Sequence, residues 1–165
     1  MSEIIKQMDS RRVFIETLRE LAKSDDKIIV LIPDVGFNYL SEPDMPFRVI
    51  NGGVTEQSLT MIAVGLSLSG FKVFYYSMIP FSLFRNAEMV RNGVVCHKAP
   101  VTILGVKGSS SYKFLGFSHN LLHDKEDTNF CDNIGLKWST PKTNEEVKEA
   151  VLESYKSGKP SYIRL

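Results

Sequence analysis

The sequence has 165 residues, and its 43% hydrophobic and 24% charged residues exclude a disordered chain and indicate one globular domain. Its 20 Lys and Arg residues nearly balance 19 Asp and Glu residues, so the charge predicts neither a nucleic-acid surface nor contact with an anionic membrane. Two cysteines without CxxC spacing exclude a disulfide framework and a cysteine-rich zinc site. Because the sequence shows no signal peptide and no apolar run long enough to span a membrane, we expect a cytoplasmic protein.

Helices and strands are expected to alternate along the chain. Short apolar runs rich in β-branched residues predict strands at residues 27–33, 48–51, 71–77, 100–106, 136–140 and 161–165. Amphipathic segments predict helices over residues 10–23, from Thr55 to Gly70, over 82–95 and from Thr143 to Gly158. Residues 34–47 and 107–118 are expected to be loops, and residues 119–135 show no clear periodicity.

Two of the helices carry starting signals. Thr55 is expected to cap the second helix, and Thr143 with Glu146 forms a T-x-x-E capping box at the start of the last one. Apolar residues at helical spacing are expected to face the sheet: Phe14, Leu18, Leu21 and Ala22 in the first helix, Leu59, Ile62, Ala63 and Leu66 in the second, and Val147, Ala150, Val151 and Tyr155 in the last.

This alternation predicts an α/β fold, a single three-layer domain with a mostly parallel sheet flanked by helices and joined by right-handed crossovers. Residues 1–9 are expected to be an N-terminal extension and residues 10–165 the domain. In sheets of this kind ligands bind outside the carboxyl ends of the strands. The loops that could form a site are therefore residues 33–40, 51–56, 77–84 and 107–120.

Two of these loops hold residues that ordinary structure also explains. Glu56 follows Gly52 and Gly53 and would lie in the first turn of a helix, where the helix dipole favours an acid. Read alone, it is a capping acid. Phe81 and Phe84 are three residues apart, and read alone they indicate core packing.

The fourth loop carries His119 and His123 at i, i+4 spacing, which on a helix could hold a metal. No HExxH pattern and no third ligand accompany them, so we expect no metal site in this chain. The segment 108–111 could cradle a phosphate, but it does not match a P-loop, and no GxGxxG occurs in the chain. A P-loop or dinucleotide site is therefore not expected.

Several segments, taken together and in this order, resemble the pyrimidine-binding domain of transketolase-type thiamine diphosphate enzymes, most closely the C-terminal subunit of bacterial split transketolases. The segments are IIVLIPDVG, RVINGGVTEQSLTMIAVGLSLSG, YSMIPFSLFRNAEMVRN, LGFSHNLLHD and the ending PSYIRL. The likeness runs from about Arg11 to Leu165. Each segment alone would be a weak signal, whereas the spaced set is specific.

The resemblance implies a catalytic role for Glu56, which matches the glutamate that hydrogen-bonds N1′ of the cofactor aminopyrimidine. A carboxyl group that shares a proton with N1′ favours the imino form at the 4′ position, which then takes the proton from C2 of the thiazolium. The proton must be available near neutral pH. Burial favours the protonated carboxyl and the helix N-terminus opposes it, and we expect burial to dominate.

Other positions acquire implied roles in the same way. Phe81 matches the aromatic residue that stacks on the pyrimidine, with Phe84 close by. Asp34 and Val35 match the loop that approaches the thiazolium. His119 matches a substrate-side histidine, which could hydrogen-bond a substrate oxygen or transfer a proton.

The sequence also departs from the family. Asn120 stands where a second histidine is common, His123 where an acid often occurs, and Leu115 where many transketolases place a substrate-binding aspartate. Substrate preference is therefore expected to differ from that of sugar-phosphate transketolases. The sequence ends at Leu165, so we also expect a subunit without the C-terminal domain that usually follows.

No Gly-Asp-Gly with a downstream Asn occurs in the sequence, and that motif would hold Mg²⁺ and the diphosphate. The resemblance thus implies thiamine diphosphate as cofactor, with Mg²⁺ held by a diphosphate-binding partner subunit, an active site at the interface and an α2β2 assembly. Transketolase-like ketol transfer between small carbonyl substrates of the sugar type is the expected reaction. A subunit of a 2-oxo acid decarboxylase and a non-catalytic regulatory relic are the alternatives.

Overall fold

The computed structural model describes residues 9–34, 40–41, 44–108 and 110–165. Its centre is a sheet of six strands in the order β2-β1-β3-β4-β6-β5, in which every neighbouring pair is parallel. The strands are β1 (Ile28–Ile32), β2 (Arg48–Asn51), β3 (Lys72–Met78), β4 (Val101–Val106), β5 (Lys137–Ser139) and β6 (Ser161–Arg164). The expected α/β fold is confirmed, and all six predicted strands are present.

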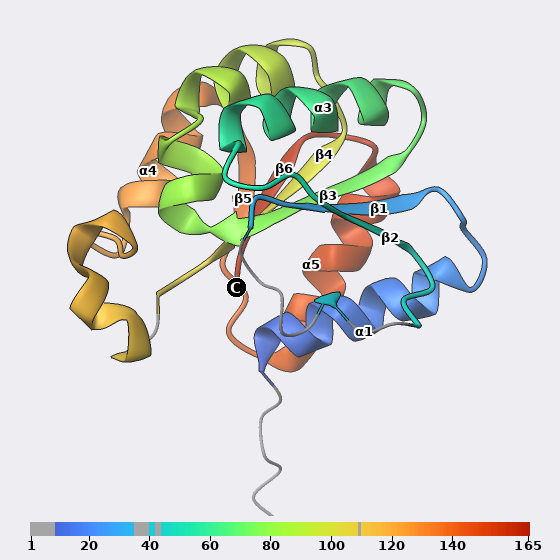
Figure 1. Ribbon diagram of the computed structural model, residues 1–165, viewed down its shortest axis with the longest axis horizontal. Helices are drawn as coiled ribbons and strands as arrows, with labels where there is room; N and C mark the ends of the chain where they lie inside the picture. The colour runs from blue at the N-terminus through green and yellow to red at the C-terminus, as the bar shows by residue number, and fades with distance from the viewer. Residues whose placement is uncertain (1–8, 35–39, 42–43, 109) are drawn as a thin grey trace, which may run out of the picture.

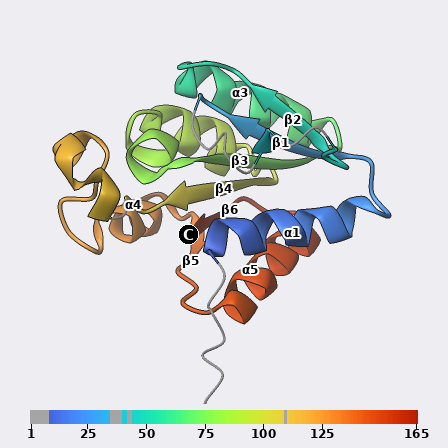
Figure 2. The same cartoon turned by 60° about the horizontal axis from the view of Figure 1, so that its bottom comes forward.

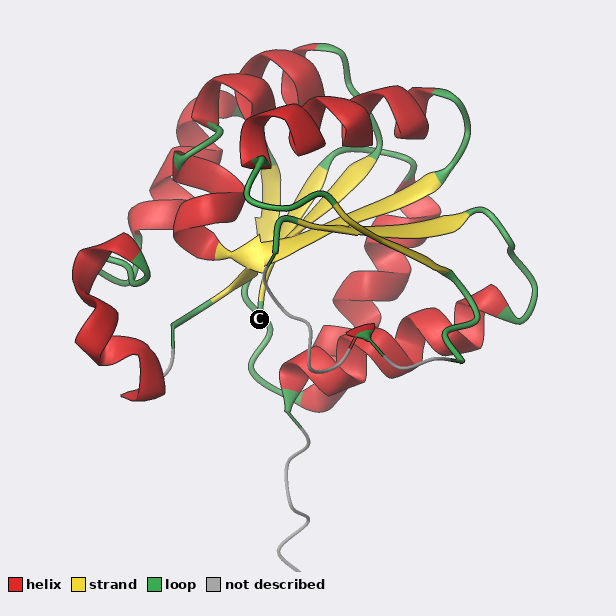
Figure 3. Ribbon diagram, in the orientation of Figure 1, coloured by secondary structure: helices red, strands yellow, loops and turns green. Residues whose placement is uncertain are grey.

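Helices cover both faces of this sheet (Figures 1 and 2). The α-helices are α1 (Ser10–Ala22), α3 (Glu56–Leu68), α4 (Glu126–Ile134) and α5 (Asn144–Ser157). Helices α1 and α5 lie on one face, whereas α3 and two π-helical segments, η1 (Pro80–Phe84) and η2 (Met89–Cys96), lie on the other. Figure 3 shows the resulting three layers, with the strands between two sets of helices.

Each face of the sheet has its own apolar core. Phe14 and Leu18 of α1 pack with Val151 of α5 and with alternate strand residues such as Phe74. On the other face Leu59 and the helical segments after β3 pack against the remaining strand residues. All five residues of β1 are buried, as expected for a strand that is covered on both faces.

Helix α5 begins as predicted. Glu146 N donates to Thr143 Oγ1 at 3.2 Å, and Thr143 N donates to Glu146 Oε2 at 3.3 Å, which completes the capping box. At α3 the prediction was wrong in detail. Thr55 takes the N-cap position, but its hydroxyl donates to the carbonyl of Gly52 at 2.8 Å and does not cap the helix.

Three further details differ from expectation. Ile62 was expected to face the sheet but is 52% exposed, because α3 presents apolar residues on more than one side. Residues expected to form a loop before residue 119 include a 3₁₀ segment, η3 (Ser110–Ser118), which is broken where Gly116 adopts a positive φ of 62°. The segment without clear periodicity contains α4.

Within the described ranges, none of the helices is both long enough and apolar enough to cross a bilayer.

Candidate active site

The carboxyl ends of the strands bring the predicted site loops to one edge of the sheet, at the left of Figure 1. At the ends of β1 and β2 the side chain of Asn51 joins two loops. Its Oδ1 accepts from the backbone N–H groups of Asp34 at 3.1 Å and Gly53 at 2.9 Å, and its Nδ2 donates to Asp34 Oδ1 at 3.4 Å. Asp34 has a left-handed φ of 57°, which this amide stabilises. Val35, predicted to lie beside it, falls outside the described residues.

Glu56 is the first residue of α3 and is 5% exposed. Gly53 adopts a positive φ of 68° just before it, so the chain turns sharply from β2 into the helix. Oε1 of the Glu56 carboxylate accepts a hydrogen bond from Arg85 Nη1 at 2.5 Å. The positive end of the helix dipole and this guanidinium both lie beside the carboxylate. The expectation that burial would outweigh the helix N-terminus did not include this guanidinium.

A network of polar side chains holds the first turn of α3 in place. Thr60 Oγ1 donates to the Glu56 carbonyl at 2.8 Å and accepts from Asn86 Nδ2 at 2.5 Å. The hydroxyl of Tyr75, on β3, lies 3.5 Å from the same carbonyl. Burial raises the pKa of Tyr75, so its hydroxyl stays protonated and available as a donor. These contacts hold the backbone of Glu56 in a set position.

Phe81 lies in the π-helical segment η1, and Arg85 is the residue that follows its last position. Arg85 N donates to the carbonyl of Pro80 at 2.9 Å, the i, i+5 bond of a π-turn. The guanidinium of Arg85 lies over the Phe81 ring, with 4.2 Å from Cζ to the ring centroid. Arg85 therefore touches both the predicted catalytic carboxylate and the predicted stacking ring. No local pattern in the sequence marks Arg85 as a site residue.

His119 reaches the same cluster from the end of η3. Its ring meets the Phe81 ring edge to face, with centroids 4.9 Å apart and an interplanar angle of 83°. Ser118 Oγ lies 2.8 Å from His119 Nδ1 and so orients the imidazole. Carboxylate, guanidinium, phenyl ring and imidazole thus form one continuous row from Glu56 to His119.

Phe84 and His123 stand apart from this row. Phe84 meets Phe130 of α4 edge to face at 6.0 Å and packs against the core on that face of the sheet. His123 lines an open cavity of about 590 Å³ together with Lys107, Lys113 and Asp124. Among the described residues no cluster of three or more His, Cys, Asp or Glu side chains is placed to hold a metal ion.

A second buried carboxylate lies nearby, on α4. Asp127 is 0% exposed; its Oδ2 accepts from the Tyr162 hydroxyl at 2.6 Å and from Arg164 Nε at 2.9 Å, and its Oδ1 accepts from Arg164 Nη2 at 2.5 Å. Arg164 Nη2 also donates to the carbonyl of Asp124 at 2.7 Å. This network, which sequence reasoning missed, ties the histidine loop and α4 to β6.

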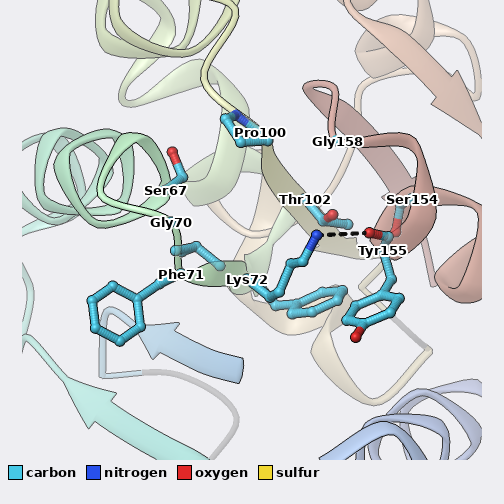
Figure 4. A pocket seen from close by; sticks show the side chains of 11 residues that line it. Ser67, Gly70, Phe71, Lys72, Pro100, Thr102, Ser154, Tyr155 and Gly158 are labelled. Carbon is cyan, nitrogen blue, oxygen red and sulfur yellow. Dashed lines mark hydrogen bonds between the residues drawn. The ribbon is translucent and has the colours of Figure 1, made fainter. Parts of the chain in front are cut away.

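A pocket at the opposite edge of the sheet contains none of the predicted site residues (Figure 4). It lies at the amino ends of β3 and β4, where Lys72 Nζ donates to the carbonyl of Tyr155 at 3.4 Å and lies 5.0 Å from the centre of its ring. The Tyr155 hydroxyl in turn donates to Asp25 at 2.7 Å. The described residues that were predicted to form the site therefore lie away from this pocket, on the side where the strands end.

Comparison with known proteins agrees with this geometry. The transketolase pyrimidine-binding domain family matches residues 6–165. A subunit of an apulose-4-phosphate transketolase from Phocaeicola vulgatus is 35% identical over 117 residues, which cover 69% of this chain and 38% of that protein. The 6-deoxy-6-sulfo-D-fructose transketolase subunit SqwH from a Clostridium species is 27% identical over 94% of this chain and 48% of that protein.

A solved structure is also similar. An inactive β4 tetramer of a split-gene transketolase superposes with a TM-score of 0.79 and 25% identity, covering 96% of this chain and 51% of that one. The chain thus spans about half or less of the length of these relatives.

Proposed function

The chain belongs to the family of transketolase pyrimidine-binding domains, and from this membership we propose that it is the pyrimidine-binding subunit of a two-subunit thiamine diphosphate enzyme. We propose transketolase-like transfer of a two-carbon ketol unit between sugar-type substrates as its reaction. The names of the relatives support this choice, because they describe subunits of transketolases that act on sugar derivatives. The observation that carries the proposal is the row from Glu56 to His119 at the carboxyl edge.

The residues of this row fit the aminopyrimidine of thiamine diphosphate. Glu56 offers a buried carboxylate oxygen, and Phe81 offers an aromatic face beside it. The planar guanidinium of Arg85 already satisfies both groups at once, so a flat, nitrogen-rich ring with an N–H donor has the matching shape and chemistry.

In the proposed reaction each side chain has a distinct task. Glu56 holds a proton between its carboxylate oxygen and a ring nitrogen, in a position where water is largely excluded. Phe81 orients the ring by stacking, and Asp34 lies on the loop that would face the thiazolium. His119 hydrogen-bonds a substrate oxygen or moves a proton to it. When bound, thiamine diphosphate supplies the nucleophilic carbon that makes and breaks bonds next to a carbonyl.

The proposal includes a diphosphate-binding partner that holds Mg²⁺, in an α2β2 assembly. Several large apolar side chains support a protein interface at the carboxyl edge, because such groups rarely stay in water on a monomer. They are Val54 (69% exposed), Phe114 (81%), Phe117 (79%) and Leu122 (73%). Ile62 and Leu68 of α3 are exposed as well.

The test is to co-express the chain with the diphosphate-binding subunit of its organism and to follow deuterium exchange at C2 of bound thiamine diphosphate. Glu56→Gln cannot share a proton with the ring, so we expect exchange to slow by at least about 100-fold, the usual contribution of general acid–base catalysis. Glu145→Gln, an exposed acid in the first turn of α5, is the matched control and should exchange normally.

The same complex is then assayed with ketoses and 2-oxo acids. Turnover of ketoses supports the transketolase reaction, whereas turnover of 2-oxo acids alone would replace it with decarboxylation. Normal C2 exchange in Glu56→Gln would remove Glu56 from the catalytic role, and a complex that binds no cofactor would leave only a regulatory domain.

A further inference from the structure

One side chain holds both of the groups that the proposed function assigns to the cofactor ring. Arg85 Nη1 donates to Glu56 Oε1 at 2.5 Å, and Arg85 Cζ lies 4.2 Å from the centre of the Phe81 ring. A pyrimidine that bonds Glu56 and stacks on Phe81 would need these same two contacts. The guanidinium therefore stands where the ring would have to bind.

Burial shows that the two groups are not open to a ligand while Arg85 stays in place. Glu56 is 5% exposed and Phe81 is 7% exposed, so neither the carboxylate nor the ring offers a free surface of pyrimidine size. The Arg85 side chain, by contrast, is 44% exposed. Much of this side chain borders solvent, so the rotation that the proposal requires leads outward and away from the core.

The backbone of Arg85 is held independently of its side chain. Its N–H donates to the carbonyl of Pro80 at 2.9 Å, and its carbonyl accepts from Gln57 Nε2 at 3.2 Å. The guanidinium itself donates to Glu56 and lies over the Phe81 ring. Movement of the Arg85 side chain would release the ion pair with Glu56 and the contact with the Phe81 ring, which also meets His119.

The chemistry of the two occupants is similar. A guanidinium is planar, carries N–H donors along its edge and stacks on aromatic rings, and a protonated aminopyrimidine shares each of these properties. After an exchange of one for the other, the Glu56 carboxylate again has a donor. A buried carboxylate with no donor would be strongly unfavourable, so Arg85 has a physical reason to hold this position.

We propose that Arg85 is a resident competitor for the pyrimidine position, which must swing outward for the cofactor ring to bind and which thereby lowers cofactor affinity. This inference rests on the proposed function. It concerns Arg85 as a determinant of affinity, and assigns the residue no contact with the reacting atoms.

The test measures the affinity of thiamine diphosphate with Mg²⁺ for the complex with the diphosphate-binding subunit, by isothermal titration calorimetry. Arg85→Met keeps the stem that packs beside Phe81 but removes the charge and donors. We expect three- to tenfold tighter binding, the equivalent of removing a partly exposed ion pair worth about 1 kcal/mol. Arg91→Met, at an exposed arginine whose Nη1 donates to Asn92, is the matched control and should bind as the wild type does.

A second measurement reports the resting contact directly. In nitrogen-15 spectra of the full chain, Arg85 should give a side-chain N–H signal with slowed rotation about its guanidinium, and Glu56→Gln should release it. A freely rotating Arg85 in the wild type would contradict the proposal.

Failure of the inference differs from failure of the proposed function. If Glu56→Gln and Phe81→Ala weaken cofactor binding while Arg85→Met binds equally or more weakly, the function stands and the competitor role is overturned. If neither Glu56→Gln nor Phe81→Ala changes binding, the pyrimidine site itself is misplaced and both proposals fail.

Discussion

Asp127 and Glu56 are both buried carboxylates that bond an arginine at 2.5 Å, yet their surroundings differ. Three donor groups from β6 surround Asp127, and Arg164 approaches it through two nitrogens. The Arg164 side chain is 16% exposed. Glu56, among the residues described, has a single hydrogen-bond donor to its carboxylate, and that donor belongs to a 44% exposed side chain.

The difference is what we expect between an ion pair that holds the fold and one that gives way to a ligand. A carboxylate with bidentate and hydroxyl donors has its lone pairs occupied and no room for a ligand. A carboxylate with one donor on a partly exposed side chain keeps acceptor capacity for another group. The two sites lie at the same edge of the sheet, so their partners, and not their depth, decide which one can take part in chemistry.

The largest expected effect is the loss of stability when Asp127 is changed. Asp127→Asn removes the charge that Arg164 pairs with and places an amide donor against the donors of Arg164 and Tyr162. Because Arg164 is then partly buried without a counter-charge, we expect the free energy of unfolding to fall by about 3–5 kcal/mol. Urea denaturation of the full chain measures it.

The control for this prediction is Asp124→Asn. Asp124 pairs with Lys107 at 2.5 Å, but its side chain is 81% exposed, so solvent screens the pair and the change in stability should be within experimental error. A loss as small as this in Asp127→Asn would show that the network of β6 is not structural.

Much of the fold could be predicted because its signals are local. The buried strand β1 is a run of apolar, mostly β-branched residues, and the capping box of Thr143 lies within four residues. Helix α4 was missed because its N-cap, Lys125, makes no side-chain cap and few of its nine residues are apolar. Ile62 was misplaced because a helix with apolar residues on several sides has no single buried face to read.

The site was predictable only in part, for a related reason. Glu56, Phe81 and His119 were proposed from their resemblance to a family, and the structure brings them into one row. The arginine partners were missed because Arg85 lies 29 residues from Glu56 and Arg164 lies 37 residues from Asp127. Ion pairs across such separations leave no periodic pattern in a sequence.

A smaller effect is expected at Tyr162, whose hydroxyl is the third donor to the Asp127 carboxylate. Tyr162→Phe removes a hydrogen bond to a buried carboxylate while Arg164 stays, so we expect a loss of about 1.5–3 kcal/mol in the free energy of unfolding. The same hydroxyl predicts a pH dependence. Burial and the neighbouring Asp127 carboxylate raise the pKa of Tyr162 well above its ordinary value of 10.0.

The sign of this dependence follows from the raised pKa. Below pH 10.0 the phenol is protonated in both states and its full contribution to stability is present. Above that value the unfolded chain loses the proton more readily, so stability falls as pH rises. Unfolding curves from pH 8 to about 11 should show a steeper decline in the wild type than in Tyr162→Phe, and parallel curves would contradict the assignment.

The smallest effect on the free energy of unfolding is expected at Glu56. It distinguishes a carboxylate that takes part in the reaction from one that holds the fold. Glu56→Gln keeps a carbonyl oxygen that can accept from Arg85, and Arg85 can move into solvent if that bond is weak. The change in the free energy of unfolding should therefore stay within about 1 kcal/mol, the range of partly exposed ion pairs. If Glu56→Gln instead destabilises the chain as much as Asp127→Asn does, Glu56 is an acid that holds the fold, and its pairing with Arg85 is as permanent as the pair on β6. For a catalytic Glu56 we expect Glu56→Gln to lose little stability but much of the C2 exchange. A catalytic carboxylate must be able to change hydrogen-bond partners without destabilising the helix on which it lies.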